Sequence, residues 1–213
     1  VIWGQYFTGH WSEISRFQQV LDEIYKRLQD IEGTGFPLIS GYNALLVLAL
    51  SREDQVAVES IQALLRILAP QFLGIKSISS IALMYRDGDF SQYETGKRGS
   101  DLAGVPIMVF NEYEQCPPEE LFKMGDYYAD DLTLRTSNIA KALITNDNEA
   151  LAQAIDEAEE HQLIVHAAHM RIVLAKRTGD KRHLERARPV LERLGDRLFL
   201  RKLHEVEKLL QLE

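Results

Sequence analysis

Apolar residues recur at steps of three and four along most of this chain, which is the spacing of one helix face. The longest stripe of this kind lies between Ser12 and Glu32, with Ser12 suited to the helix start and Gly33 to its end. Residues 38–50 are apolar nearly all round, which predicts a helix buried between neighbours. The same reasoning predicts further helices at residues 53–68, 119–131, 136–145, 148–161, 165–177, 181–194 and 197–210. The predicted buried stripe of the helix at 53–68 is Val56, Ile61, Leu64, Leu65 and Leu68.

The middle of the chain allows two interpretations. Residues 72–85 fit a helix, but residues 78–85 followed by Asp87-Gly88 also fit a β-hairpin. Residues 91–103 predict a helix weakened by two glycines, and residues 105–110 have the composition of a strand. We therefore predict an all-α chain with a small irregular or β segment in its middle, and the repeat described next favours the helix at 72–85.

One short pattern occurs four times, starting at Leu46, Ile81, Ile139 and Ile172. In each copy apolar residues end a helix, and an Asp eight residues after the start is placed to cap the next helix. Gly or Asn precedes that Asp in three copies and suits a left-handed turn. Two of the three steps between copies are 35 and 33 residues, close to the ~34-residue period of helix-turn-helix repeats. One helix pair cannot cover its own apolar face, so several must stack.

These residues resemble the tetratricopeptide repeat (TPR) family. Residues 136–195 carry most of the likeness and residues 38–103 a looser version of it. The family's Trp, Gly-Tyr and Ala positions are mostly not occupied, and Pro189 falls inside a second helix. The chain is similar to the divergent repeats of the ligand-sensing and protein-binding regions of large bacterial transcription regulators. The resemblance implies an α-solenoid of stacked antiparallel helix pairs.

We expect three regions in the chain. They are an N-terminal helical-repeat half at 1–104, an irregular connecting segment at 105–135 and C-terminal TPR-like repeats at 136–213. The first residue is Val1, so we expect a processed chain or part of a longer protein. There is no secretory signal pattern, no apolar run near the ~20 residues of a membrane span, and one cysteine, which together favour the cytoplasm.

Charge narrows the class of partner. The net charge is −8, although residues 176–213 carry more basic than acidic side chains. An acidic body disfavours direct binding to nucleic acid or to anionic membranes, because both require neutralisation of phosphates. We therefore expect a protein or peptide partner, with a small-molecule effector as the alternative.

Catalytic and metal motifs are weak throughout the sequence. His161, His166 and His169 lie close together, but they match no zinc motif, and we predict helix-boundary and packing histidines and no metal site. Residues 94–100 resemble a phosphate loop only faintly, because the first Gly and the final Ser or Thr of the motif are missing. We predict no cofactor and no enzymatic activity.

The candidate partner-binding residues form two groups, each of which is also compatible with ordinary core or solvated positions. Aromatic side chains suit a recognition surface because they supply contact area at low entropy cost, and arginines suit an acidic partner. The aromatic group is Tyr113, Phe122, Tyr127 and Tyr128, and the basic group is Arg182, Arg186 and Arg193, with Arg197 and Arg201 beyond it.

Three functional hypotheses follow from these observations. The first is a non-enzymatic protein–protein interaction or scaffold module with a TPR-like groove, acting in signal transduction or transcription regulation. The second is the ligand-sensing repeat region of a bacterial transcription regulator, with its ligand near Tyr113 to Tyr128. The third is a helical enzyme that uses the three histidines at an unrecognised site.

Overall fold

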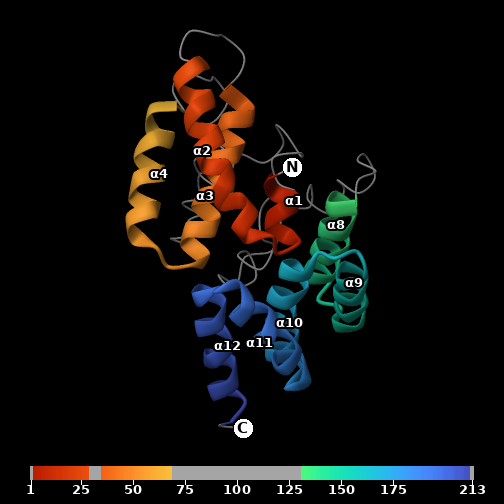
Figure 1. The fold of residues 1–213 in the computed structure, drawn as a ribbon. Coiled ribbons are helices and arrows are strands. Elements are labelled where there is room, and N and C mark those ends of the chain that lie inside the picture. Colours follow the sequence, from red (N-terminus) through yellow and green to blue (C-terminus); the bar gives the residue numbers. More distant parts are fainter. Residues whose placement is uncertain (1, 29–34, 69–130, 212–213) are drawn as a thin grey trace. The chain divides into compact units, whose positions relative to one another are not determined.

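The computed structural model describes residues 2–28, 35–68 and 131–211, and every regular element in these ranges is an α-helix (Figure 1). The all-α prediction is confirmed for the described part of the chain. The predictions for residues 72–110, including the hairpin alternative, and the helix predicted from Glu119 lie outside the described residues, as does the boundary expected at 104. Among the described helices, none combines the length and apolar content that a membrane span requires.

The described helices belong to two compact units, which we describe separately. Unit 1 holds α1 (Ile2–Phe7) apart from its last residue, α2 (Trp11–Leu28), α3 (Gly35–Ser51) and α4 (Gln55–Leu68). Unit 2 holds residues 7–9 together with α8 (Asp131–Ile144), α9 (Asn148–Glu160), α10 (Ile164–Thr178), α11 (Arg182–Leu194) and α12 (Arg197–Leu209).

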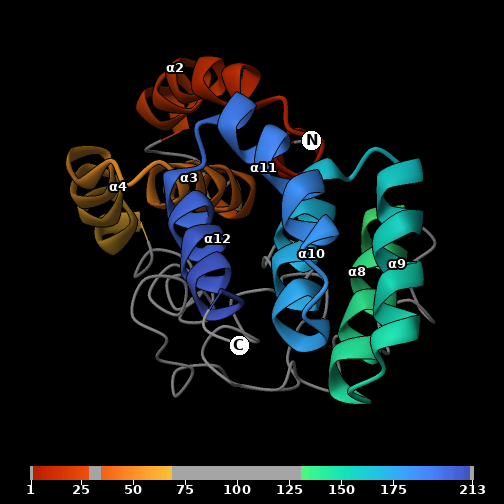
Figure 2. The same ribbon diagram turned by 90° about the horizontal axis from the view of Figure 1, so that it is seen from below.

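Helix α3 is the centre of unit 1. Both α2 and α4 pack against it, and Figure 2 shows α3 next to each of them. All residues from Gly41 to Ala49 are buried. This confirms the prediction of a helix buried between neighbours, because an apolar surface on every side must be covered on every side.

The short helix α1 was not predicted from the sequence. Its anchor is aromatic: the rings of Tyr6 and Trp11 stack with centroids 5.3 Å apart, and the Trp11 indole N–H donates to the Tyr6 carbonyl. The Tyr6 hydroxyl and Ser51 Oγ are hydrogen-bonded at 3.0 Å, which ties α1 to the end of α3. Six residues are too few to show a helical period, so burial of aromatic side chains is what defines this element.

Helix α4 corrects one detail of the predicted core. The sequence places Val56 in the buried stripe with Ile61, but Val56 is 79% exposed and Val58 is buried instead. Five residues turn a helix by about 140° beyond a full turn, so Val56 and Ile61 lie on opposite sides. The core face of α4 consists of Val58, Ile61, Leu65 and Leu68.

In unit 2 each helix packs against the next one along the chain, and α10 also packs against α12. Figure 2 shows α10 between α9 and α12. All residues from Val165 to Ala175 are buried. The loops between successive helices are two or three residues long, and the helix ends agree with the predicted ones within two residues from α9 onward.

The predicted turn chemistry is present in both units. Asn146 and Gly179 have the left-handed φ values of 54° and 75°. Asp147 accepts a hydrogen bond from the Ala150 N–H and Asp54 from the Ala57 N–H, so both cap a helix as predicted. Asp180 does not cap α11 as predicted, because the N-cap residue of that helix is Lys181; Asp180 lies one residue before it and accepts from the Arg182 N–H.

Candidate functional site

The two predicted partner-binding groups have different outcomes. The aromatic group of Tyr113, Phe122, Tyr127 and Tyr128 lies outside the described residues. The basic group of Arg182, Arg186 and Arg193 lies on α11, and all three side chains are exposed. The candidate site within the described residues is therefore the outer face of α11, and we call it the arginine face.

Helical spacing brings the three arginines together. Steps of four and seven residues return to the same side of a helix within about 40°. The opposite side of α11 is fixed in the core by Leu184, Ala187, Leu191 and Leu194. The arginine face therefore points outward because an apolar stripe anchors the other side of the same helix.

Arg186 takes part in a charged network that joins three helices. Its guanidinium contacts Glu159 closely and lies 3.5 Å from Asp156, and both carboxylates come from α9. The same two carboxylates accept from Arg171 of α10, Glu159 at 2.6 Å and Asp156 at 2.8 Å. The network positions α11 against α9 through the helix that lies between them.

Arg171 is the buried member of this network, with a side chain only 2% exposed. Burial alone lowers the pKa of a guanidinium, but the hydrogen bonds to Glu159 and Asp156 outweigh it and raise the pKa of Arg171. A third contact joins Arg171 to the Nδ1 atom of His183 at 3.3 Å. Burial, together with the nearby arginines, lowers the pKa of His183, so this ring is a neutral neighbour of the network.

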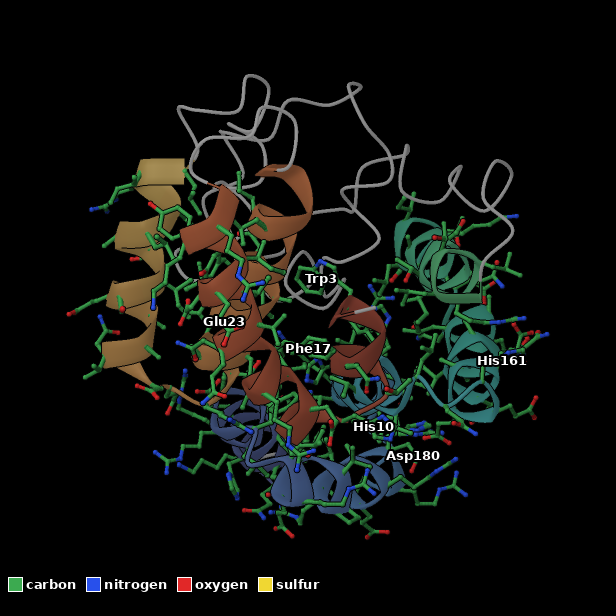
Figure 3. All side chains as sticks on the ribbon, turned by 45° about the horizontal axis from the view of Figure 1, so that its top comes forward. Trp3, His10, Phe17, Glu23, His161 and Asp180 are labelled. Atoms are coloured by element: carbon green, nitrogen blue, oxygen red, sulfur yellow. The ribbon has the colours of Figure 1, made fainter. Side chains whose placement is uncertain are left out.

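Arg182 and Arg193 differ from Arg186 in their surroundings. Arg182 pairs with Asp180 at 2.7 Å, and Asp180 lies at the start of α11 (Figure 3). The hydrogen bonds from the Arg182 side chain and backbone lower the pKa of Asp180 to about 2. Arg193 is exposed and makes no ion pair with another described residue. All three guanidiniums thus have N–H groups at the surface.

The three histidines do not come together as a metal site. His161 is exposed at the end of α9 (Figure 3), whereas His166 and His169 are buried on α10. Within the described residues, no three His, Cys, Asp or Glu side chains lie close enough to hold a metal ion. Of the three, His166 and His169 pack in the core of unit 2, and His161 lies at a helix boundary.

His169 is part of a buried pair that sequence reasoning missed. Its Nε2 atom lies 2.8 Å from Asp196 Oδ2, and its ring stacks on Phe199 with centroids 3.5 Å apart. The other carboxylate oxygen of Asp196 accepts from the Phe199 N–H and caps α12. Both side chains of the pair are almost fully buried, so a substrate cannot reach them. The pair joins α10 to the start of α12.

A sequence signal for Asp196 was present. Gly195 has a left-handed φ of 66°, so Gly195-Asp196 repeats the Gly-Asp turn at residues 179–180. The turn could have been found from the sequence, but the partner of Asp196 lies 27 residues away and could not.

His166 is also buried, but unlike His169 it has no carboxylate partner among the described residues. Neither ring nitrogen has a hydrogen-bond partner among the described residues. The ring packs edge-on against Phe7, with ring centroids 4.1 Å apart. Burial, with His169 nearby, lowers the pKa of His166 to about 3. The ring is therefore neutral near pH 7 and behaves as part of the apolar core.

Comparison with models of known families, with curated proteins and with solved structures found no match to this chain.

Proposed function

We propose that this chain is a non-enzymatic protein-binding module in which unit 2 is a stack of TPR-like antiparallel helix pairs. The observation that carries the proposal is the packing order of α8 to α12. Each helix contacts the next, and α10 also contacts α12, as the first helices of successive two-helix repeats do. Loops of two or three residues favour antiparallel neighbours.

The partner surface in this proposal is the arginine face and not a groove along α10. Helices of a repeat array bind partners through residues that solvent can reach, but every residue of α10 from Val165 to Ala175 is buried. The arginine face is exposed over about three helical turns. It also lies on a helix whose other side is anchored in the core by four apolar residues, so little ordering is needed on binding.

The chemistry of the arginine face favours a peptide segment that carries carboxylates. Guanidiniums bind carboxylates through two parallel hydrogen bonds. The carboxylates that now pair with Arg182 and Arg186 are themselves partly exposed, and exposed ion pairs contribute little to stability. Carboxylates of a partner can therefore replace them at small cost, while Arg193 has no ion pair with another described residue to exchange.

Chemical cross-linking of the native chain in its own lysate, followed by mass spectrometry, tests the proposal. Simultaneous substitution of Arg182, Arg186 and Arg193 by Gln should abolish the partner cross-links while the far-ultraviolet circular dichroism stays helical. The matched control replaces Arg16, Lys26 and Arg27 by Gln, because these are also three exposed basic residues on one helix. Equal loss in both variants would indicate non-specific charge attraction, and cross-links that survive in the α11 variant would rule out the arginine face.

A further inference from the structure

Helix α4 has an apolar surface on the side that faces away from its own core. Val56, Ser60, Ala63 and Ile67 lie on this side, and we call them the outer face of α4. Val56 is 79% exposed and Ile67 is 56% exposed, and they are two of the four exposed large hydrophobic residues in the described chain. Within unit 1, α4 lies at the edge and packs against α3 (Figures 1 and 2).

The spacing of the outer face suits a second helix. Its residues follow one another at steps of four, three and four, as the seam residues of paired helices do. Ser60 and Ala63 at the centre are small, so a second backbone can approach closely there. Ala57 and Leu64 continue the apolar surface on one flank, and both are only half-exposed.

The other flank carries one charge of each sign. Glu59 and Arg66 are both exposed and lie seven residues apart, one on each side of the middle of α4. Glu59 accepts a hydrogen bond from Gln55 at 2.9 Å, and Arg66 makes no ion pair with another described residue. In an antiparallel pair of α4 helices, each of these charges can therefore lie beside the opposite charge of the second copy.

An antiparallel pair of α4 helices satisfies all of these features together. With a two-fold axis between Ile61 and Gln62, Val56 meets Ile67 of the second copy and Ser60 meets Ala63 of the second copy. The flank residues then place Glu59 beside the second copy's Arg66, and symmetry produces the same pair again. A parallel pair would instead place Glu59 beside Leu64 and leave both charges unmatched.

We infer that α4 is a self-association surface, through which two copies of this chain pair antiparallel across the outer face, with two symmetric Glu59–Arg66 ion pairs. The inference uses only unit 1 and is independent of the arginine face. A contact made by one helix of 14 residues is smaller than a standard protein interface, so the dissociation constant should be weak, on the order of 100 μM.

Sedimentation of the full chain from about 10 μM to about 1 mM tests the inference by bracketing that constant. We expect a reversible monomer–dimer equilibrium. Val56→Glu or Ile67→Glu should weaken it by at least about tenfold, because each buries a carboxylate in an apolar seam. Val20→Glu on α2 is the matched control, since Val20 is also an exposed valine, and it should change nothing. A chain that stays monomeric, or a dimer that ignores both α4 substitutions, overturns the inference.

Charge reversal tests the antiparallel direction. E59R and R66E each place like charges side by side and should weaken the dimer by about three- to tenfold. Mixing the two variants should restore association, because one chain then presents two positive charges and the other two negative ones. The double variant E59R/R66E should also associate as the original chain does. Failure of both rescues would exclude the proposed pairing.

Discussion

The central helices of the two units, α3 and α10, are both buried along most of their length, but they bury different chemistry. Helix α3 is apolar apart from a few groups such as Tyr42 and Asn43. Helix α10 buries the titratable side chains of His166, His169 and Arg171. The two helices are thus buried to a similar extent, but α3 needs mainly apolar surface from its neighbours, whereas α10 also needs polar or charged partners.

An apolar helix accepts any apolar surface of suitable shape, whereas a buried charged group requires a specific partner. The partners of α10 come from both sides in sequence: Asp156 and Glu159 precede it and Asp196 follows it. These pairs fix the register of α9, α10 and α12. The comparison indicates that unit 2 is held by specific polar contacts as well as by burial, and that its stability should respond to pH and to single polar substitutions.

The largest effect we expect is a loss of unit 2 stability at low pH, caused by the buried, neutral His166. Its pKa is about 3 in the folded chain and about 6.5 when exposed, so between these values the unfolded state binds more protons. The contribution of His166 to stability should therefore be fully present above about pH 6.5, and it should fall by about 1.4 kcal/mol per pH unit below it, up to about 5 kcal/mol in all. Urea unfolding followed by circular dichroism at pH 7.0, 5.5 and 4.5 measures this slope.

His166→Leu should flatten this slope, because the variant has no imidazole to protonate and keeps an apolar side chain in the same place. His161→Gln is the control, since His161 is exposed at the end of α9. An unchanged slope in His166→Leu would show that another group dominates the acid response.

The second largest effect should follow removal of Asp196. Asp196→Ala removes the cap of α12 and leaves His169 buried without its carboxylate, which should lower the free energy of unfolding by about 3 kcal/mol. Hydrogen exchange followed by mass spectrometry should show the loss of protection in α10 and α12 and not in α3. Asp196→Asn retains an acceptor for the Phe199 N–H and should recover about 1 kcal/mol, the contribution of the cap.

The sequence predicted what depends on local chemistry. Periodicity located α9 to α12, and the Asn-Asp turn identified the cap at Asp147. The cap predicted at Asp180 was wrong by one position, because Lys181 is the N-cap residue of α11. The sequence could not predict the Asp196–His169 pair, because that contact depends on how two helices pack across 27 residues. It assigned the wrong face to Val56 because several apolar residues on both sides of α4 obscure the phase of the stripe.

In the candidate site, too, local features could be predicted from the sequence and tertiary contacts could not. The shared face of Arg182, Arg186 and Arg193 follows from helical spacing alone and could be predicted. The carboxylate partners of Arg186 on α9 could not, because Glu159 lies 27 residues from Arg186 and meets it only through tertiary packing.

Removal of a buried polar group from α3 should cost less stability than removal of Asp196, the partner of α10. Burial and a hydrogen bond to Asp22 raise the pKa of Tyr42, and the hydroxyl donates to Asp22 Oδ1 at 2.7 Å. Tyr42→Phe should cost about 1 to 2 kcal/mol, because the ring keeps its packing and only one hydrogen bond to a partly exposed carboxylate is lost. Hydrogen exchange should place this loss in α2 and α3. A cost equal to that of Asp196→Ala would contradict the view that unit 1 depends mainly on apolar burial.

The smallest effect concerns the turns before α4 and α9, which share a left-handed residue followed by a capping Asp. In unit 1 that residue is Glu53, with φ 53°, and in unit 2 it is Asn146, with φ 54°. Glutamate is strained in this region, whereas asparagine tolerates it. Glu53→Gly should therefore stabilise unit 1 by about 0.5 kcal/mol, the relief of strain less the extra entropy of glycine, and Asn146→Gly should change unit 2 less. Glu53→Gln separates strain from charge, because it keeps the strained backbone and removes only the carboxylate. If Glu53→Gln stabilises unit 1 as much as Glu53→Gly does, the cost at this turn is electrostatic, and the two turns differ in charge and not in backbone strain.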